Sequence, residues 1–242
     1  MRSGRSGRHR KKTFECACKD VKKALSNGRL EAALLRLQEM ERTELVPENR
    51  CYELHEYMGQ LLYWLADLKE ALPHLRLAWE LSREDSAARL AALSNYLMYL
   101  HYAADVTDAE MCAAHAVYAA MLGEVPRFSH GKRQREKIRI GYLSPNITDH
   151  IVLNFAIQLF SAYDRTCFEV YLYDIGSLQG ETTDWVAGMA DHYTDLSKKS
   201  PQEAAQRIYA DEIDILFDLA GHSAGGKTLQ IAAFKPAPVQ IS

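Results

Sequence analysis

Lys137-Ile138-Arg139-Ile140-Gly141-Tyr142-Leu143-Ser144-Pro145 marks the point at which the hydrophobic pattern of the chain changes. From here on, short apolar runs rich in β-branched and aromatic residues alternate with segments of helical character. This alternation predicts a parallel β-sheet with helices on both faces. The strands are expected at residues 138–143, 168–173, 213–219 and 239–241, with a weaker one at 192–196. The helices are expected at about 151–163, 182–190, 201–211 and 225–234, the third with Ser200 as its N-cap and Glu203 closing a capping box.

Upstream of this stretch, residues 14–123 carry apolar positions at three- and four-residue spacing, which is typical of amphipathic helices. One pair of helices has a more specific pattern. His55-x-x-Met58-Gly59-x-x-Leu62 followed by Ala71-x-x-x-Leu75-x-x-Ala78 matches a tetratricopeptide repeat, in which Gly59 and Ala71 stand where the two helices approach closely. A partial second copy, residues 28–33, aligns with residues 66–71 at an offset of 38 rather than 34. An ordinary stack of helical hairpins is the alternative, and both arrangements present an extended surface suited to binding a protein or peptide.

The composition is that of a globular protein. Of the 242 residues, 48% are hydrophobic and 25% are charged, and no apolar run reaches the length of a membrane-spanning helix. We expect a disordered basic tail at residues 1–13, a helical repeat region at 14–129 and a sheet-containing region at 130–242. The first 12 residues hold six Lys or Arg and no acid, which leaves a net charge of −9 on residues 13–242. This net negative charge argues against nucleic-acid binding.

The five cysteines are scattered, and none forms a Cys-x-x-Cys pair. This spacing argues against a structural zinc site and against a disulfide scaffold. We therefore expect reduced thiols and no structural zinc site. Reduced thiols favour a cytoplasmic location, or a nuclear one if the source is eukaryotic.

Polar residues follow three of the expected strands, at the edge where open parallel sheets bind their ligands. The three loops are residues 143–150, 174–177 and 218–227. His150 stands at the end of the first loop, just before a helix, where an imidazole could act as a general base near neutral pH. The same position also suits a histidine that only hydrogen-bonds the helix backbone.

The third loop holds a second candidate pair. Asp218 and His222 are four residues apart across a strand end, which suits a hydrogen-bonded acid–base pair as well as two structural side chains. The segment from Gly221 to Thr228 is glycine-rich and carries Lys227, and it matches the Walker pattern Gly-x-x-x-x-Gly-Lys-Thr letter for letter. Nucleotide binding by this loop is kept as a weaker alternative, because the flanking pattern does not indicate a nucleotide-binding strand order.

At these residues the chain resembles a known family, the O-linked N-acetylglucosamine transferases and Spindly-type proteins. The resemblance rests on four blocks in the same order. They are residues 137–145 followed by His150, Phe168-Glu169-Val170-Tyr171-Leu172-Tyr173, Ile213-Asp214-Ile215-Leu216-Phe217-Asp218-Leu219-Ala220-Gly221-His222-Ser223, and Lys235-Pro236-Ala237-Pro238-Val239-Gln240. Tetratricopeptide repeats on the N-terminal side also fit this family. One departure is Asn146-Ile147, which stands where family members commonly have an acidic–aromatic pair.

The resemblance implies an α + α/β architecture: tetratricopeptide-like repeats followed by one Rossmann-like half of a two-domain glycosyltransferase. It implies transfer of a sugar from a nucleotide donor to a Ser or Thr hydroxyl of a protein, with inversion at the anomeric carbon. UDP-N-acetylglucosamine is the donor expected by default, and transfer of fucose is the Spindly-type alternative. The repeats are implied to hold the acceptor polypeptide, and neither a metal nor a cofactor is implied.

In the family, the histidine at the position of His150 lines the active site and has been proposed as a base, and Asp218 and His222 fall near the cleft. The resemblance places the second, nucleotide-holding half beyond Ser242, together with a lysine that neutralises the leaving diphosphate. Because charge stabilisation of the leaving group is a large part of such catalysis, we expect this chain alone to be inactive or nearly so. The alternative is a non-enzymatic, repeat-based protein-binding scaffold.

Overall fold

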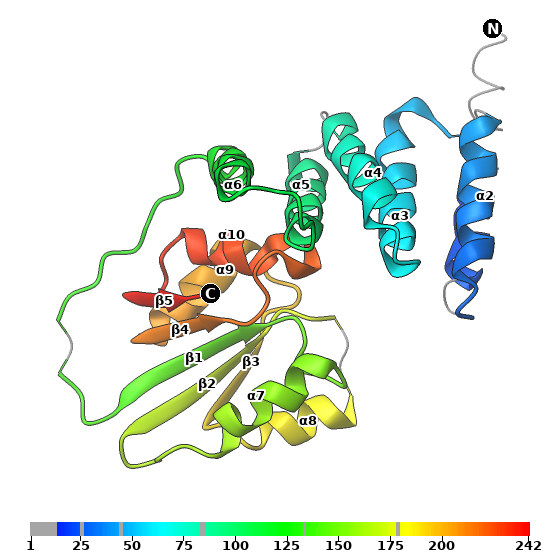
Figure 1. Cartoon of the computed structure of the whole chain (residues 1–242). Helices are drawn as coiled ribbons and strands as arrows, with labels where there is room; N and C mark the ends of the chain where they lie inside the picture. Colours follow the sequence, from blue (N-terminus) through cyan, green and yellow to red (C-terminus); the bar gives the residue numbers. More distant parts are fainter. Residues whose placement is uncertain (1–13, 25–26, 44–45, 83–85, 133, 178–179) are drawn as a thin grey trace, which may run out of the picture. The chain divides into compact units, whose positions relative to one another are not determined.

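The computed structural model describes residues 14–24, 27–43, 46–82, 86–132, 134–177 and 180–242. The basic tail predicted at residues 1–13 lies outside the described residues. The chain divides into two compact units, Met1–Met121 and Leu122–Ser242 (Figure 1). The boundary expected between residues 129 and 130 lies in the segment that joins the last helix of the first unit to the first strand of the second. The predicted order, helices followed by a parallel sheet, is confirmed.

The first unit is built from helices and contains no strand within its described residues. Its core gathers Leu37 and Met40 with Leu54, Met58 and Leu61, all of them buried. No helix in the described part of the whole chain is both long enough and apolar enough to cross a bilayer. The helices are residues 14–24, α2 (Leu30–Arg42), α3 (Cys51–Trp64), α4 (Leu68–Leu81), α5 (Ser86–Leu100) and α6 (Asp108–Leu122), with a 3₁₀ turn η1 (Glu48–Arg50) before α3.

The close approach predicted at Gly59 is confirmed. A Cβ atom at this position would lie 2.5 Å from Cγ of Leu75 and 3.1 Å from the carbonyl oxygen of Ala71. Ala71 is itself completely buried against α3. Helices α3 and α4 therefore pack with no room for a larger side chain at either position, as in a tetratricopeptide repeat.

The partial repeat predicted from residues 28–33 and 66–71 is also visible in the backbone. Gly28 and Ala66 both adopt the left-handed conformation, with φ of 68° and 64°. The N–H of the residue that follows each one donates to the carbonyl five residues back, Arg29 to Ala24 and Asp67 to Leu62, both at 2.8 Å. Helices α2 and α4 thus begin after the same kind of turn. Only glycine adopts this turn without strain, and the second copy carries an alanine.

The second unit is a five-stranded parallel sheet with the strand order β3-β2-β1-β4-β5. The chain moves outward from β1 to one side through β2 and β3, and then returns to the other side of β1 through β4 and β5. The strands are β1 (Ile138–Ser144), β2 (Phe168–Asp174), β3 (His192–Asp195), β4 (Ile215–Asp218) and β5 (Val239–Ile241). The helices are α7 (Ile151–Ser161), α8 (Glu181–Ala187), α9 (Pro201–Ala210) and α10 (Lys227–Ala233), with a 3₁₀ turn η2 (Ser223–Gly226).

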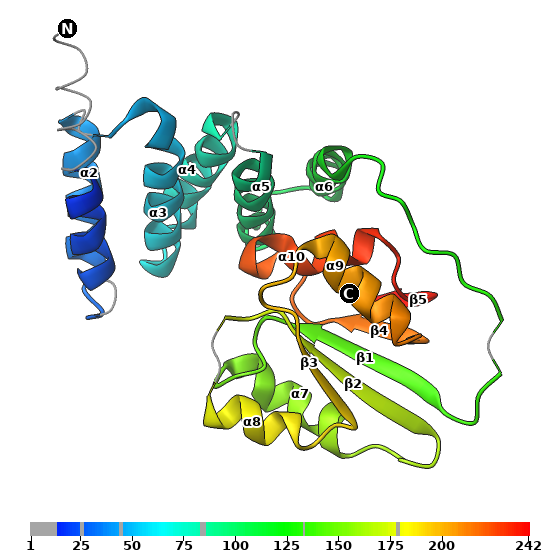
Figure 2. The same ribbon diagram turned by 180° about the vertical axis from the view of Figure 1, so that it is seen from behind.

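Each face of the sheet is covered by two helices (Figures 1 and 2). Because successive side chains of a strand point to opposite faces, Tyr142 and Leu172 pack under α7 and α8, whereas Leu143 and Tyr173 pack under α9 and α10. Because both faces of β1 and β2 are buried, each of these strands is a continuous apolar run in the sequence. Ile147 is buried in the α7 side of the core.

The structure also confirms the capping signals that the sequence shows at the start of α9. The capping box at Ser200 and Glu203 is present, with Pro201 in the first turn of α9. The strand expected at residues 213–219 is shorter than predicted, because Glu212 takes a left-handed turn (φ 53°) just before it and regular pairing begins at Ile215.

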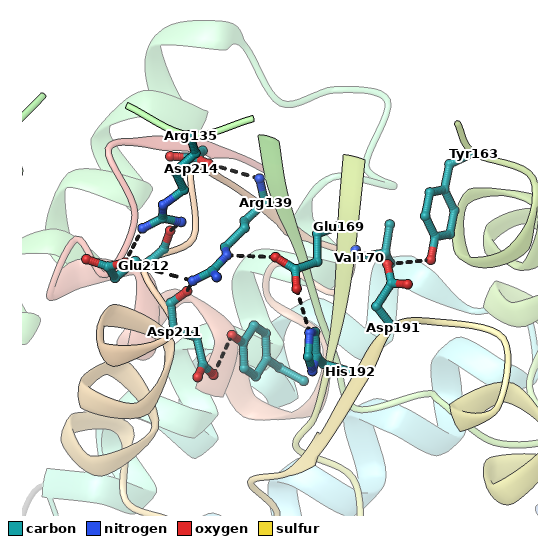
Figure 3. Close-up of polar contacts among 11 residues, drawn as sticks. Arg135, Arg139, Tyr163, Glu169, Val170, Asp191, His192, Asp211, Glu212 and Asp214 are labelled. Atoms are coloured by element: carbon teal, nitrogen blue, oxygen red, sulfur yellow. Dashed lines mark hydrogen bonds and ion pairs between the residues drawn. The ribbon is translucent and has the colours of Figure 1, made fainter. Parts of the chain in front are cut away.

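The amino ends of the strands are joined by a polar network (Figure 3). The Arg139 guanidinium of β1 donates to the Glu169 carboxylate of β2 at 2.8 Å, and the same carboxylate contacts the His192 ring of β3 at 2.8 Å. Asp191 accepts from the N–H of Val170 at 2.8 Å. These contacts fix the spacing of three strands at the edge opposite to the predicted site.

Candidate active site

The three predicted site residues lie in two loops at the carboxyl edge of the sheet. His150 ends the loop between β1 and α7, whereas Asp218 and His222 belong to the connection between β4 and α10. Strands β1 and β4 are neighbours, with Leu143 paired to Asp218 in the register. The chain leaves β1 and β4 toward opposite sides of the sheet, so these two loops flank the crevice at which open α/β sheets bind ligands.

The first four strands all end in the same kind of turn. In each, the side-chain oxygen of the last strand residue accepts the backbone N–H two residues further on, which is the hydrogen bond of an Asx or Ser/Thr turn. The four bonds are Ser144 to Asn146 at 3.0 Å, Asp174 to Gly176 at 2.8 Å, Asp195 to Ser197 at 2.8 Å and Asp218 to Ala220 at 2.8 Å.

Asp218 therefore shapes its loop. Its Oδ1 atom also accepts from the N–H of Gly221 at 3.0 Å, and its Oδ2 atom accepts from the Ser242 hydroxyl at 3.1 Å. Both oxygens of the carboxylate are engaged by these donors. An acid–base partnership between Asp218 and His222 stays a prediction.

His150 is the N-cap of α7 and is exposed. Its Nδ1 atom accepts a hydrogen bond from the N–H of Val152 at 3.2 Å. In a neutral ring held this way, the proton resides on Nε2, so the outward nitrogen is a donor. The ring can accept a proton at Nε2 only in the other tautomer, which requires that it give up the cap.

Lys227 makes a contact at the carboxyl edge that the sequence did not predict. Its ammonium donates to the carbonyls of Leu196 and Ser197, at 3.4 and 3.0 Å, and so ties the loop after β4 to the loop after β3. Burial lowers the pKa of Lys227, and the carboxylate of Asp195 partly offsets that effect. No sequence signal identifies this contact, because its partners are backbone atoms.

The same geometry weighs against the Walker alternative. Thr228, which would face a magnesium ion in such a loop, is buried and donates its hydroxyl hydrogen to the Gly221 carbonyl at 3.1 Å. Lys227 is directed to carbonyl groups, as described above. Within the described residues, no group of three or more His, Cys, Asp or Glu side chains is arranged to hold a metal ion.

The loops after β1 and β2 are in contact: the N–H of Ile175 donates to the Ser144 carbonyl at 3.0 Å, and Gly176 lies against Pro145. A Cβ atom on Gly176 would lie 2.3 Å from the carbonyl oxygen of Pro145, which belongs to the loop that leads to His150. Asp174, fully buried, holds this second loop through Gly176 and accepts from the Tyr193 hydroxyl at 2.9 Å. The position of the His150 loop therefore depends on a glycine in the neighbouring loop.

Comparison with known proteins agrees with this architecture. The model of glycosyl transferase family 41 matches residues 101–242, which is more than half of the chain and includes the whole carboxyl edge described above. The chain belongs to this family.

Two curated relatives illustrate the similarity. The probable UDP-N-acetylglucosamine–peptide N-acetylglucosaminyltransferase SEC of Arabidopsis thaliana is 31% identical over 140 residues, 54% of this chain and 14% of that protein. The probable enzyme SPINDLY of Solanum lycopersicum is 26% identical over 156 residues, 61% of this chain and 17% of that protein. The chain thus spans less than a fifth of the length of either relative.

A solved structure shares the fold along nearly the whole chain. A mutant of the O-GlcNAc transferase of Thermobaculum terrenum superposes with a TM-score of 0.68 at 23% identity, and the match covers 96% of this chain and 50% of that one. The likeness shows that the two chains share this fold.

Proposed function

We propose that the protein transfers N-acetylglucosamine from UDP-N-acetylglucosamine to a Ser or Thr hydroxyl of a protein acceptor, with inversion at the anomeric carbon. The observation that carries this proposal is the family match over residues 101–242. In the reaction, the hydroxyl oxygen forms a bond to the anomeric carbon while the bond from that carbon to the diphosphate oxygen breaks. The hydroxyl proton leaves to a base, and UDP departs.

We propose that the crevice between the loops after β1 and β4 faces the reacting groups, with His150, Asp218 and His222 around it. Asp218 serves there by holding its loop through the backbone of Ala220 and Gly221. His150 is the base candidate. It performs that role when acceptor binding releases its ring from the N–H of Val152, which frees the ring to present an unprotonated nitrogen.

Two substitutions separate the base from the cap. His150→Asn keeps a good N-cap but cannot take a proton, whereas His150→Ala loses both functions. If His150 is the base, both variants of the protein as cells make it should lose transfer about 100-fold or more. If transfer by the asparagine variant equals that of the unsubstituted protein, His150 is only a cap.

We further propose that the 242 residues alone are inactive or nearly so. The departing diphosphate needs fixed positive charge around it. At the described carboxyl edge, the ammonium of Lys227 is directed to two backbone carbonyls. Transfer by the purified 242-residue chain at a rate typical of enzymes, about 1 per second or faster, would contradict this proposal.

The five cysteines are scattered along the sequence without a Cys-x-x-Cys pair, and this spacing favours reduced thiols. Cys16, Cys112 and Cys167 are exposed. We therefore propose a cytoplasmic location. The test is labelling of the three exposed thiols in intact cells. A reagent that crosses the membrane should label them, and a reagent that cannot cross it should leave them unlabelled.

A further inference from the structure

Two histidines of the helical unit meet between the end of α5 and the middle of α6 (Figure 1). His101 follows α5 directly and is exposed, and His115 lies in α6 and is half-buried. Their Nε2 atoms are 3.4 Å apart, and the two rings meet edge to face with their centroids 5.2 Å apart. Both rings therefore bring the same nitrogen to one place at the surface of the unit.

The ring of His115 is held in one tautomer by its own helix. Its Nδ1 atom lies 2.9 Å from the carbonyl oxygen of Met111, one turn earlier in α6. Because a carbonyl oxygen only accepts, Nδ1 carries the hydrogen, and in the neutral ring Nε2 then carries the lone pair that a metal ion needs. A backbone carbonyl on the other ring nitrogen is also the usual outer-shell partner of a histidine that ligates a metal. The ring is thus oriented as a ligand by contacts within α6.

The distance between the two Nε2 atoms matches one coordination geometry. Zinc binds histidine nitrogens at about 2.0 to 2.1 Å in a tetrahedron, which places two ligand nitrogens about 3.3 to 3.4 Å apart. Neighbouring ligands at right angles, as around an octahedral or square-planar ion, would be about 2.9 Å apart at the same bond length. The observed separation of 3.4 Å therefore fits a tetrahedral ion. As a direct contact between two nitrogens, it is only a long hydrogen bond.

The charge of the surrounding segment favours a cation. Residues 101–122 hold three carboxylates, those of Asp105, Asp108 and Glu110, and neither a lysine nor an arginine. Such a one-sided distribution produces a negative local potential, which attracts metal ions.

We propose that His101 and His115 bind a Zn²⁺ ion that fastens α6 to the end of α5. Two water molecules complete the tetrahedron, which the exposure of His101 permits. The ring hydrogen of His101 moves from Nε2 to Nδ1 through solvent, so that each ring presents a lone pair to the ion. Of the fifteen residues of α6, all of them described, Tyr118 alone is buried, so the ion adds a cross-link to a helix with little packing of its own. The binding does not depend on the proposed transferase activity and needs no sugar donor.

A second histidine pair in the same unit provides a matched control. His55 of α3 and His74 of α4 stack with their Nδ1 atoms 2.9 Å apart. His55 is only 8% exposed, which leaves no access for the water that would complete the coordination of an ion. The carboxylate of Glu41 lies 3.8 Å from the other ring nitrogen of His55, so it cannot join the two Nδ1 atoms. We therefore expect this pair to bind no zinc.

The test is competition for Zn²⁺ between the full 242-residue chain and a chromophoric chelator. The three exposed cysteines, Cys16, Cys112 and Cys167, are replaced by serine in every variant, so that their thiols do not bind the ion. Loss of an outer-shell partner of a ligating histidine costs about 10- to 100-fold in metal affinity, so loss of the ligand itself should cost about tenfold or more. His101→Ala and His115→Ala should each have this effect, and the double variant should be no weaker than either single one.

Hydrogen exchange provides a second readout, because a metal cross-link should slow the exchange of the α6 backbone amides. Zinc should slow it in the chain with both histidines and in His74→Ala, whose zinc affinity should stay within about a factor of two, but not in His115→Ala. Circular dichroism confirms that each variant is folded. Zinc binding by the double variant that equals that of the chain with both histidines would overturn the proposal. An effect of only one of the two histidines, as for an adventitious surface ligand, or an equal effect of His74→Ala would also overturn it.

Discussion

Replacing Gly59 by alanine should destabilise the helical unit, although alanine is the better helix former. The added methyl would lie 2.5 and 2.8 Å from the Cγ and Cδ2 atoms of Leu75, where ordinary carbon contacts are about 3.5 to 4 Å. The Leu75 side chain, or α4 as a whole, must therefore move away by about 1 Å. Overpacking of this kind costs about 3 kcal/mol at the upper end of its usual range, and the gain in helix propensity is about 1 kcal/mol. The net loss in the free energy of unfolding should be about 2 kcal/mol.

Urea denaturation measures this loss. Two of the three tryptophans, Trp64 and Trp79, belong to the helical unit, and Trp185, on α8 of the sheet unit, is exposed enough to be replaced by phenylalanine. In this Trp185→Phe background, fluorescence reports on the helical unit. The midpoint should fall by about 1 M urea for a slope of about 2 kcal/mol per molar.

A double-mutant cycle checks that the clash with Leu75 is the cause. Leu75→Ala alone removes the clashing atoms and costs about 2 to 5 kcal/mol, because it leaves a cavity. In that background, Gly59→Ala should be neutral or stabilising by up to about 1 kcal/mol, which gives a coupling free energy of about 2 to 3 kcal/mol. An equal effect of Gly59→Ala in both backgrounds, or stabilisation in the otherwise unchanged protein, would refute the close-packing argument.

Three further predictions follow from single sites. Ala66→Gly should raise the stability of the helical unit by about 0.5 to 1 kcal/mol in the same urea assay, because glycine relieves the strain of the left-handed turn by more than its entropy cost. Gly176→Ala should lower the rate of sugar transfer by the protein as cells make it by more than any loss of folded protein explains, because the methyl displaces Pro145 and with it the loop of His150. An unchanged rate of transfer would contradict this. Burial raises the pKa of Asp191, but the N–H of Val170 and other donors hold it below its usual range, so its stabilising effect is present above about pH 4 and is lost as pH falls through the folded pKa. Urea unfolding between pH 6 and 3 should accordingly show a steeper loss in the original protein than in Asp191→Asn.

The sequence predicted the sheet unit well because its strands have a clear hydrophobic pattern. In β1 and β2 both faces are buried, so continuous apolar runs follow from the fold itself, and Ser200 and Glu203 show where α9 begins. The left-handed turn at Glu212, which shortens β4, has no such signal, because glutamate rarely adopts that conformation.

The candidate site was only partly predictable. Sequence spacing brings His150 and Asp218 to neighbouring loops, since parallel strands share one carboxyl edge. It does not indicate that Asp218 is held by the backbone of its own loop, or that Lys227 reaches the carbonyls of another loop. Contacts of side chains with backbone atoms depend on the local path of the chain, which residue types alone do not specify.

The measurement that tests the central claim most directly is sugar transfer by the protein as cells make it. An antibody against residues 14–123 isolates that form, whatever its length, and the isolated protein is incubated with radiolabelled UDP-N-acetylglucosamine and a Ser/Thr peptide. The account predicts label on the peptide, loss of most of that label with His150→Ala, and no label from GDP-fucose. Peptide that remains unlabelled by UDP-N-acetylglucosamine, while the isolated protein is folded and intact, would contradict the proposed activity and favour a protein-binding scaffold. Label from GDP-fucose instead would keep the glycosyltransferase and overturn the choice of sugar.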